Sequence, residues 1–161
     1  MDILTDVALL SRIQFALTVA YHFIFVPLSI GLGLITAIFA TKYYRSRDEK
    51  DGAAVRLWVK IFTATFAIGV ATGITMEFSF GTNWADYSRF VGDIFGAPLA
   101  AEALFAFFLE SVFLGVLLFG RNKVSPKFYT VSAWLVWAGS LLSALWILIA
   151  NSWMQTPAGA E

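Results

Sequence analysis

Four long apolar stretches constrain this chain of 161 residues more than any other feature. They run from about residue 13 to 41, 57 to 78, 97 to 120 and 128 to 154. A helix needs about 20 mostly apolar residues to cross a bilayer, and none of the stretches alternates as a membrane strand would. Because irregular backbone cannot face lipid, residues 1–161 are predicted to form one all-α integral membrane bundle of about four transmembrane helices.

The composition excludes several function classes. The chain is 59% hydrophobic and 14% charged, whereas a soluble domain carries about 25% charged residues. Its 11 basic and 11 acidic residues balance, which argues against binding to nucleic acid. It has no cysteine and one histidine, so it provides no disulfide, zinc–thiolate or iron–sulfur ligands and no multi-histidine metal centre by itself.

The basic residues predict how the chain crosses the membrane. They are concentrated in the linker 42–56 and the turn 121–127, whereas the other side holds only Arg12 and Arg89. Since cytoplasmic loops are enriched in Lys and Arg, both basic linkers are predicted to be cytoplasmic. The N-terminus, the polar linker 79–96 and the C-terminus are therefore expected outside. The acidic start MDILTD lacks the basic region of a signal peptide, so the first span is expected to be retained.

Local signals indicate where the helices end and bend. Gly52 is the predicted breaker in the first basic linker, and Pro98 suits the first turn of the third helix. Pro27 inside the first span predicts a kink. Trp146 is expected to pack inside the bundle, whereas the other tryptophans near span ends are predicted interfacial anchors: Trp58, Trp84, Trp134, Trp137 and Trp153.

His22 lies near the middle of the first span and has two readings. It either hydrogen-bonds to a neighbouring helix or serves as an axial ligand to a haem or metal ion. In the second case Arg12, about 15 Å away along a helix, is available to a haem propionate. Ionisable residues inside a membrane usually carry function, but position alone leaves both readings open.

Glu102 and Glu110 both lie in the third span and are expected to handle protons or to contact a cofactor. Their spacing leaves them about 80° apart around a regular helix and about 12 Å apart along it, too far to share a proton. The alternative is that each is protonated or pairs with a residue outside this chain. Ser143 is expected at a depth similar to that of Glu110, and Asn151 near the outer end of the fourth span.

The second span carries two further features. Gly69 and Gly73 form a GxxxG pair, which fits close helix packing and carries no information on chemistry by itself. Glu77 ends the span at the outer interface, where a cap or a salt bridge is as good a reading as chemistry.

Four longer strings resemble a known family. They are SRIQFALTVAYHFIFVPLSIG (11–31), GVATGITMEFSFGTNW (69–84), GDIFGAPLAAEALFAFFLES (92–111) and SALWILIANSWMQTPAG (143–159). Together they resemble the N-terminal part of subunit I of cytochrome bd quinol oxidase. The resemblance covers nearly the whole chain, and the strings hold rare residue types in a fixed order.

The resemblance implies a terminal respiratory oxidase in the bacterial cytoplasmic membrane. Such an oxidase takes electrons from quinol and reduces oxygen to water with cytoplasmic protons, using b-type and d-type haems. His22 matches the family's axial ligand to one high-spin haem, and Glu102 and Glu110 match its paired glutamates near that site. Ser143 and Asn151 match polar positions of the same region.

The family's subunit I is much longer than this chain. The remainder of that subunit is implied to hold the quinol-binding loop and the other haem ligands, and a second subunit and small subunits are implied as partners beside membrane lipid. The chain is therefore predicted to be incomplete, and inactive as an oxidase by itself. Two other functions stay open, a proton or ion transport module and a structural membrane subunit without haem.

Overall fold

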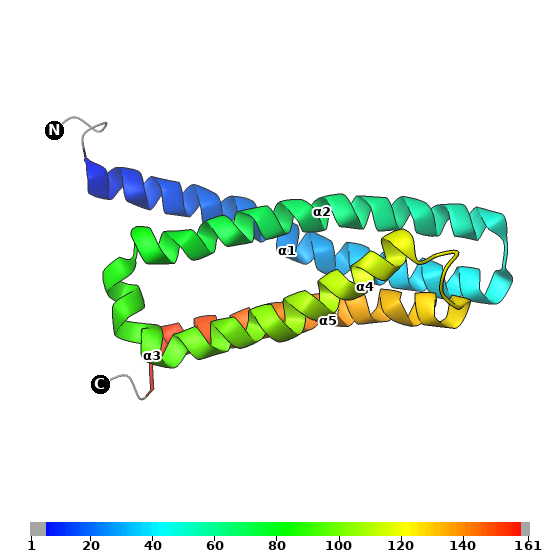
Figure 1. Ribbon diagram of the computed structural model, residues 1–161. Coiled ribbons are helices and arrows are strands. Elements are labelled where there is room, and N and C mark those ends of the chain that lie inside the picture. Colours follow the sequence, from blue (N-terminus) through cyan, green and yellow to red (C-terminus); the bar gives the residue numbers. More distant parts are fainter. Residues whose placement is uncertain (1–5, 159–161) are drawn as a thin grey trace.

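The computed structural model describes residues 6–158, apart from the side chain of residue 95. Residues 1–5 of the acidic start and residue 159, which ends the last family-like string, lie outside the described residues. The described backbone is helical almost throughout (Figure 1), which confirms the all-α prediction. Its elements are α1 (Val7–Ser46), α2 (Glu49–Thr82), α3 (Ala85–Glu102), the π-helical turn η2 (Ala103–Phe107), α4 (Phe108–Phe119) and α5 (Pro126–Gln155).

Four helical segments are long and apolar enough to cross a membrane, as the sequence predicts. Each overlaps one of the four predicted stretches, and the first two extend several residues beyond the predicted ends. The third is composite, because α3, η2 and α4 follow one another without a break (Figure 1). The four segments are Val7–Ser46, Glu49–Thr82, Gly96–Phe119 and Pro126–Gln155.

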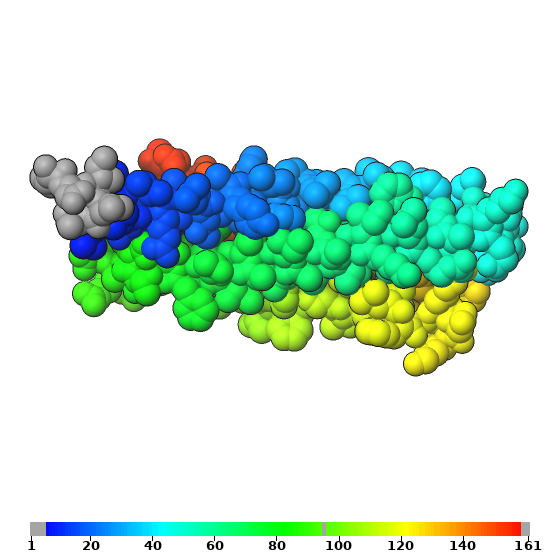
Figure 2. All heavy atoms as spheres, turned by 90° about the horizontal axis from the view of Figure 1, so that it is seen from above, coloured from blue at the N-terminus to red at the C-terminus, as the bar shows by residue number. Residues whose placement is uncertain are grey.

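The bundle is elongated, with α1 and α2 side by side along its length (Figure 2). Helix α5 packs on α1 and on α4. Helix α1 begins and α5 ends at one end of the bundle, and both basic linkers lie at the other end (Figure 1). The linkers thus share one side, as the charge pattern requires, and the assignment of that side to the cytoplasm remains a prediction.

The first basic linker is much shorter than predicted, because both neighbouring helices extend into it. The chain reverses at Arg47, whose φ of 57° is left-handed, and at Asp48, which caps α2 by accepting a hydrogen bond from the amide of Lys50 at 2.9 Å. A short polar side chain that caps the next helix is sufficient to end one helix and begin another. The predicted loop over residues 42–56 is therefore wrong for most of its length.

Gly52 is not a breaker, since it lies buried within α2. A Cβ at this position would lie 2.5 Å from Nη2 of Arg121 and 2.9 Å from the ring of Tyr43. Arg121 donates to the Gly52 carbonyl at 2.7 Å, and its guanidinium carbon lies 4.7 Å from the centre of the Tyr43 ring. The glycine therefore provides the space in which the second basic turn docks on the first.

The polar linker 79–96 is also mostly helical, contrary to the sequence expectation. Helix α2 runs to Thr82 and α3 begins at Ala85, so Pro98 lies deep in α3 and not in its first turn. Glycine in a helix costs only about 1 kcal/mol relative to alanine, so the glycines of this segment weaken the helix without ending it. Pro27 likewise lies within α1, which continues past it.

Within this chain Trp146 is not buried, contrary to the sequence expectation. It is 40% exposed, and its indole nitrogen donates to the carbonyl of Pro98 at 2.7 Å. The carbonyl oxygen of Pro98 thus accepts a hydrogen bond from a side chain of another helix. The contact ties α5 to α3.

The main core lies in the half of the bundle next to the basic linkers. It is formed by the second half of α1, the first half of α2, α4 and the first half of α5, through the side chains Leu32, Ala37, Ala40, Val55, Val59, Phe62, Leu114, Leu117, Tyr129, Ala133 and Val136. In the other half the buried cluster described by the structure centres on Val91 and Ala150. Large apolar side chains there are exposed, among them Phe23 at 71% and Phe105 at 77%.

Candidate functional site

Two carboxyl–hydroxyl pairs join the third span to α5. Ser140 donates to Oε1 of Glu110 at 2.5 Å, and Ser143 donates to Oε1 of Glu102. Glu110 is buried, with 6% of its surface exposed. Each of the two predicted glutamates thus has a partner within this chain, so neither depends on a residue outside it for a hydrogen bond.

The partner of Ser143 differs from the sequence expectation. Ser143 was expected at the depth of Glu110, but it pairs with Glu102, and Ser140 pairs with Glu110. Ser140, which the sequence places near mid-depth beside Ser143, was not among the predicted site residues. A signal was available, because serines three residues apart share one face of a helix and lie within a span that faces the glutamates.

The π-helical turn η2 brings both glutamates to the same face. Its hydrogen bonds join residue i to i+5, so it takes up about one residue more than a turn of α-helix. The eight-residue spacing of Glu102 and Glu110 then equals about seven residues of regular helix, which leaves them about 20° apart. The predicted separation of about 80° is therefore wrong, and both carboxyls face α5.

Gly139 permits the close approach of α5 to this turn. A Cβ at this position would lie 3.1 Å from Cβ of Glu110 and 3.4 Å from the carbonyl oxygen of Ala106 in η2. Gly139 is buried and directly precedes Ser140. The absent side chain is therefore what brings the Ser140 hydroxyl within reach of the Glu110 carboxyl.

His22 lies on the side of α1 that contacts α2. Its Nδ1 is 2.9 Å from Oγ1 of Thr72, and a Cβ on Gly73 would lie 3.2 Å from its Cε1. A Cβ on Gly69 would lie 3.6 Å from Cβ of Phe25. Gly73 thus lies against the histidine and Gly69 against Phe25 of the same helix, so this motif helps to position a candidate ligand as well as packing two helices.

The remaining predicted site residues stand apart from these contacts. Arg12 is exposed on the first part of α1, and Asn151 is exposed near the end of α5. Within residues 6–158, no hydrogen bond joins either of them to His22, Glu102 or Glu110. Their roles remain predictions.

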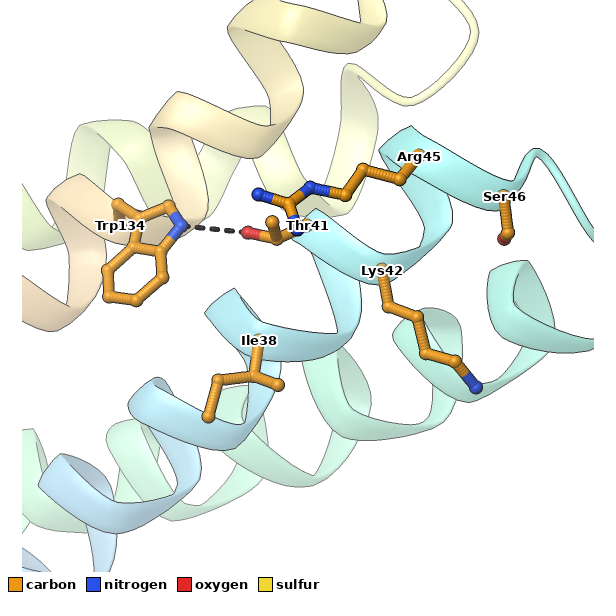
Figure 3. A pocket seen from close by; sticks show the side chains of 6 residues that line it. All are labelled: Ile38, Thr41, Lys42, Arg45, Ser46 and Trp134. Atoms are coloured by element: carbon orange, nitrogen blue, oxygen red, sulfur yellow. Dashed lines mark hydrogen bonds between the residues drawn. The ribbon is translucent and has the colours of Figure 1, made fainter.

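A separate pocket lies at the end of the bundle that holds the basic linkers. Figure 3 shows it between α1 and α5, where Trp134 donates to Oγ1 of Thr41 at 2.9 Å. Ile38, Lys42, Arg45 and Ser46 complete its lining. It is remote from His22 along α1, so it does not belong to the candidate site.

The fold and the site define a class of protein. It is a multi-pass membrane protein in which carboxyl groups and one histidine within the spans are held by hydroxyl groups of neighbouring helices. Among the described residues, no group of three or more His, Cys, Asp or Glu side chains could hold a metal ion.

Comparison with known proteins assigns the family. The chain belongs to the cytochrome bd terminal oxidase subunit I family, whose model matches residues 10–161. It is 57% identical over 156 residues to cytochrome bd-II ubiquinol oxidase subunit 1 of Escherichia coli (strain K12), covering 97% of this chain and 30% of the relative. It is 51% identical over 150 residues to cytochrome bd ubiquinol oxidase subunit 1 of Bacillus subtilis (strain 168), covering 93% of this chain and 32% of the relative.

A solved structure has the same fold. The bd oxidase from Geobacillus thermodenitrificans matches with a TM-score of 0.85 and 33% sequence identity, over 94% of this chain and 35% of that chain. The family resemblance inferred from the sequence is confirmed. The chain spans about a third of the length of the relatives it matches.

Proposed function

We propose that this chain is the haem-binding N-terminal part of a quinol:oxygen oxidoreductase in the bacterial cytoplasmic membrane. In this role the complete enzyme takes electrons from quinol and reduces oxygen to water with protons from the cytoplasm. The rest of subunit I, a second subunit and small subunits complete the assembly. The observation that carries the proposal is the set of partnered His and Glu side chains inside the spans of a chain whose relatives are named ubiquinol oxidases.

His22 fits an axial ligand to haem iron. The contact with Thr72 engages Nδ1, which leaves Nε2 as the ring nitrogen for the iron. Phe23 and Ile24 on the same stretch of α1 are 71% and 58% exposed, so apolar surface is available beside this part of the helix. The iron of a b-type or d-type haem, when bound, would be the site at which oxygen is reduced. Arg12 is the proposed partner of a haem propionate.

Glu110 and Glu102 are the proposed stations of the proton path to that place. They face the same helix, and Glu110 lies nearer the end with the basic linkers, which we assign to the cytoplasm. A serine hydroxyl can donate to an ionised carboxylate and accept from a protonated carboxyl. Ser140 and Ser143 therefore hold each glutamate in both protonation states, and Asn151 is a polar position of the same region.

The test is a reduced-minus-oxidised visible spectrum of the purified native assembly beside its His22→Ala variant. A haem signal that shrinks in the variant is expected, because the iron loses its axial nitrogen. A matched variant, His22→Gln, keeps a polar side chain of similar length without an imidazole and should lose the same signal.

An assembly that contains no haem would contradict the proposal. In that case a proton-flux measurement on vesicles holding the assembly would separate its two rivals. Flux that depends on Glu110 would indicate a transport module, and its absence a structural subunit.

A further inference from the structure

Thr72 stands between His22 and the backbone of its own helix. Its Oγ1 lies 2.9 Å from Nδ1 of His22, 2.9 Å from the carbonyl oxygen of Ile68 and 3.0 Å from that of Gly69. A hydroxyl group has one hydrogen to donate and two lone pairs with which to accept. Three neighbours therefore compete for one donor.

The chemistry of these neighbours favours one position for the hydroxyl hydrogen. A carbonyl oxygen only accepts, so the contacts with Ile68 and Gly69 exist only if the Thr72 hydroxyl donates to them. Threonines within helices commonly donate to the carbonyl four residues earlier, and Thr63, Thr65 and Thr75 of the same helix do so. A lone pair of Thr72 then faces His22, and the hydrogen of that contact comes from the ring.

We infer that Thr72 is a positioning residue, which holds His22 in the tautomer that carries its hydrogen on Nδ1 and offers the lone pair of Nε2 to the iron. The inference rests on the proposed role of His22 as a haem ligand. Histidines that bind metals generally donate their other ring hydrogen to a fixed acceptor, which sets the tautomer and the ring orientation. Here the Thr72 hydroxyl, whose own hydrogen is given to the helix, is one such acceptor, and the backbone of Gly69 also faces the ring.

Gly73 provides the space for this arrangement. A Cβ at this position would lie 3.2 Å from Cε1, 3.8 Å from Nδ1 and 3.9 Å from Nε2 of His22. The imidazole therefore lies directly against the backbone of α2 beside Thr72. A larger residue at position 73 would push the ring away from the hydroxyl that orients it.

The test compares three variants of the complete oxidase assembly. Thr72→Val keeps the shape and removes the acceptor, Thr72→Ser keeps the hydroxyl, and Thr75→Val removes a hydroxyl that bonds only to its own helix. The measurements are the haem content per assembly, the position of the haem absorption bands, and the reduction potential of the haem that His22→Ala removes.

We expect Thr72→Val to shift the bands and the potential of that haem and to weaken its binding by about 10-fold or more. Thr72→Ser should restore all three, and Thr75→Val should leave them as in the parent. Bands, potential and haem content that are unchanged in Thr72→Val, while His22→Ala loses the haem, would overturn the inference and leave the proposed function standing. Equal effects of Thr72→Val and Thr75→Val would also overturn it, because the cause would then be the packing of α2. Full haem retention in His22→Ala would instead overturn the proposed ligand.

Discussion

A buried carboxyl group needs a hydrogen-bond partner in both protonation states. A serine hydroxyl serves both, because it can donate to the carboxylate and accept from the protonated acid. Ser140 does this for Glu110 at a position where 6% of the glutamate surface is exposed. A buried polar group left without a partner costs about 1–3 kcal/mol. At this scale the small residues of α5 therefore decide whether a carboxyl can be kept inside the bundle.

The first prediction concerns this hydroxyl. Ser140→Ala should destabilise the assembly by about 1–3 kcal/mol and slow oxygen uptake, because Glu110 loses its partner. Ser132→Ala is the matched control, since Ser132 is fully buried on the same helix but donates only to the backbone of Phe128. Thermal unfolding and an oxygen electrode measure the two effects. Equal losses of oxygen uptake in both variants would contradict the assignment of Ser140 to the site.

A second prediction concerns the residue before it. Gly139→Ala places a Cβ 3.1 Å from that of Glu110, so α5 must shift, and such overpacking costs about 1–3 kcal/mol. Gly115→Ala in α4 is the control, because nothing lies within 4 Å of its added Cβ. There alanine should raise helix stability, by up to about 1 kcal/mol. Thermal unfolding of the two variants should shift in opposite directions, and an unfolding temperature that is unchanged or raised in Gly139→Ala would show that Gly139 sets no close contact.

At the scale of elements, the four helices were predictable from apolar length alone, since the bilayer sets that length. The glutamates and His22 were predictable because ionisable groups within spans are rare. Their partners were not, because pairing depends on how each helix is rotated, and the rotation of the third span depends on η2. A single π-helical turn has no spacing pattern of its own, and its residues Ala103–Phe107 read as ordinary apolar helix.

The third prediction tests that turn by changing its length in both directions. Deletion of Phe105, which is 77% exposed, should convert η2 to regular helix and keep both carboxyl–serine pairs, because seven residues restore the same face. Insertion of one alanine after Phe105 should rotate Glu110 by about 100° from Ser140 and break one pair. Thermal unfolding and the infrared carboxyl band of the assembly measure the outcome. If the deletion is as damaging as the insertion, η2 is not the device that aligns the glutamates.

At the scale of the whole molecule, the two halves of the bundle differ in how many of their apolar side chains this chain buries by itself. The main core and the docked basic turns occupy one half, whereas the half with His22 and Glu102 exposes more of its large apolar side chains. Exposed apolar surface of this extent marks contact with lipid or with further protein. The relatives are about three times as long as the matched part, so the site half is where we expect the remaining helices and the cofactor.

The last prediction follows from this asymmetry. The isolated chain, purified in detergent, should show no sustained quinol-dependent oxygen uptake, because it contains one histidine and spans about a third of its relatives. An oxygen electrode with a reduced quinol as donor makes the measurement, and the complete assembly at equal concentration is the positive control. Uptake that the isolated chain sustains over many turnovers, and that His22→Ala abolishes, would show that one axial ligand and the two glutamates form a working site without the missing helices. The isolated chain should still unfold cooperatively on heating, since the core next to its basic linkers is formed entirely by its own residues.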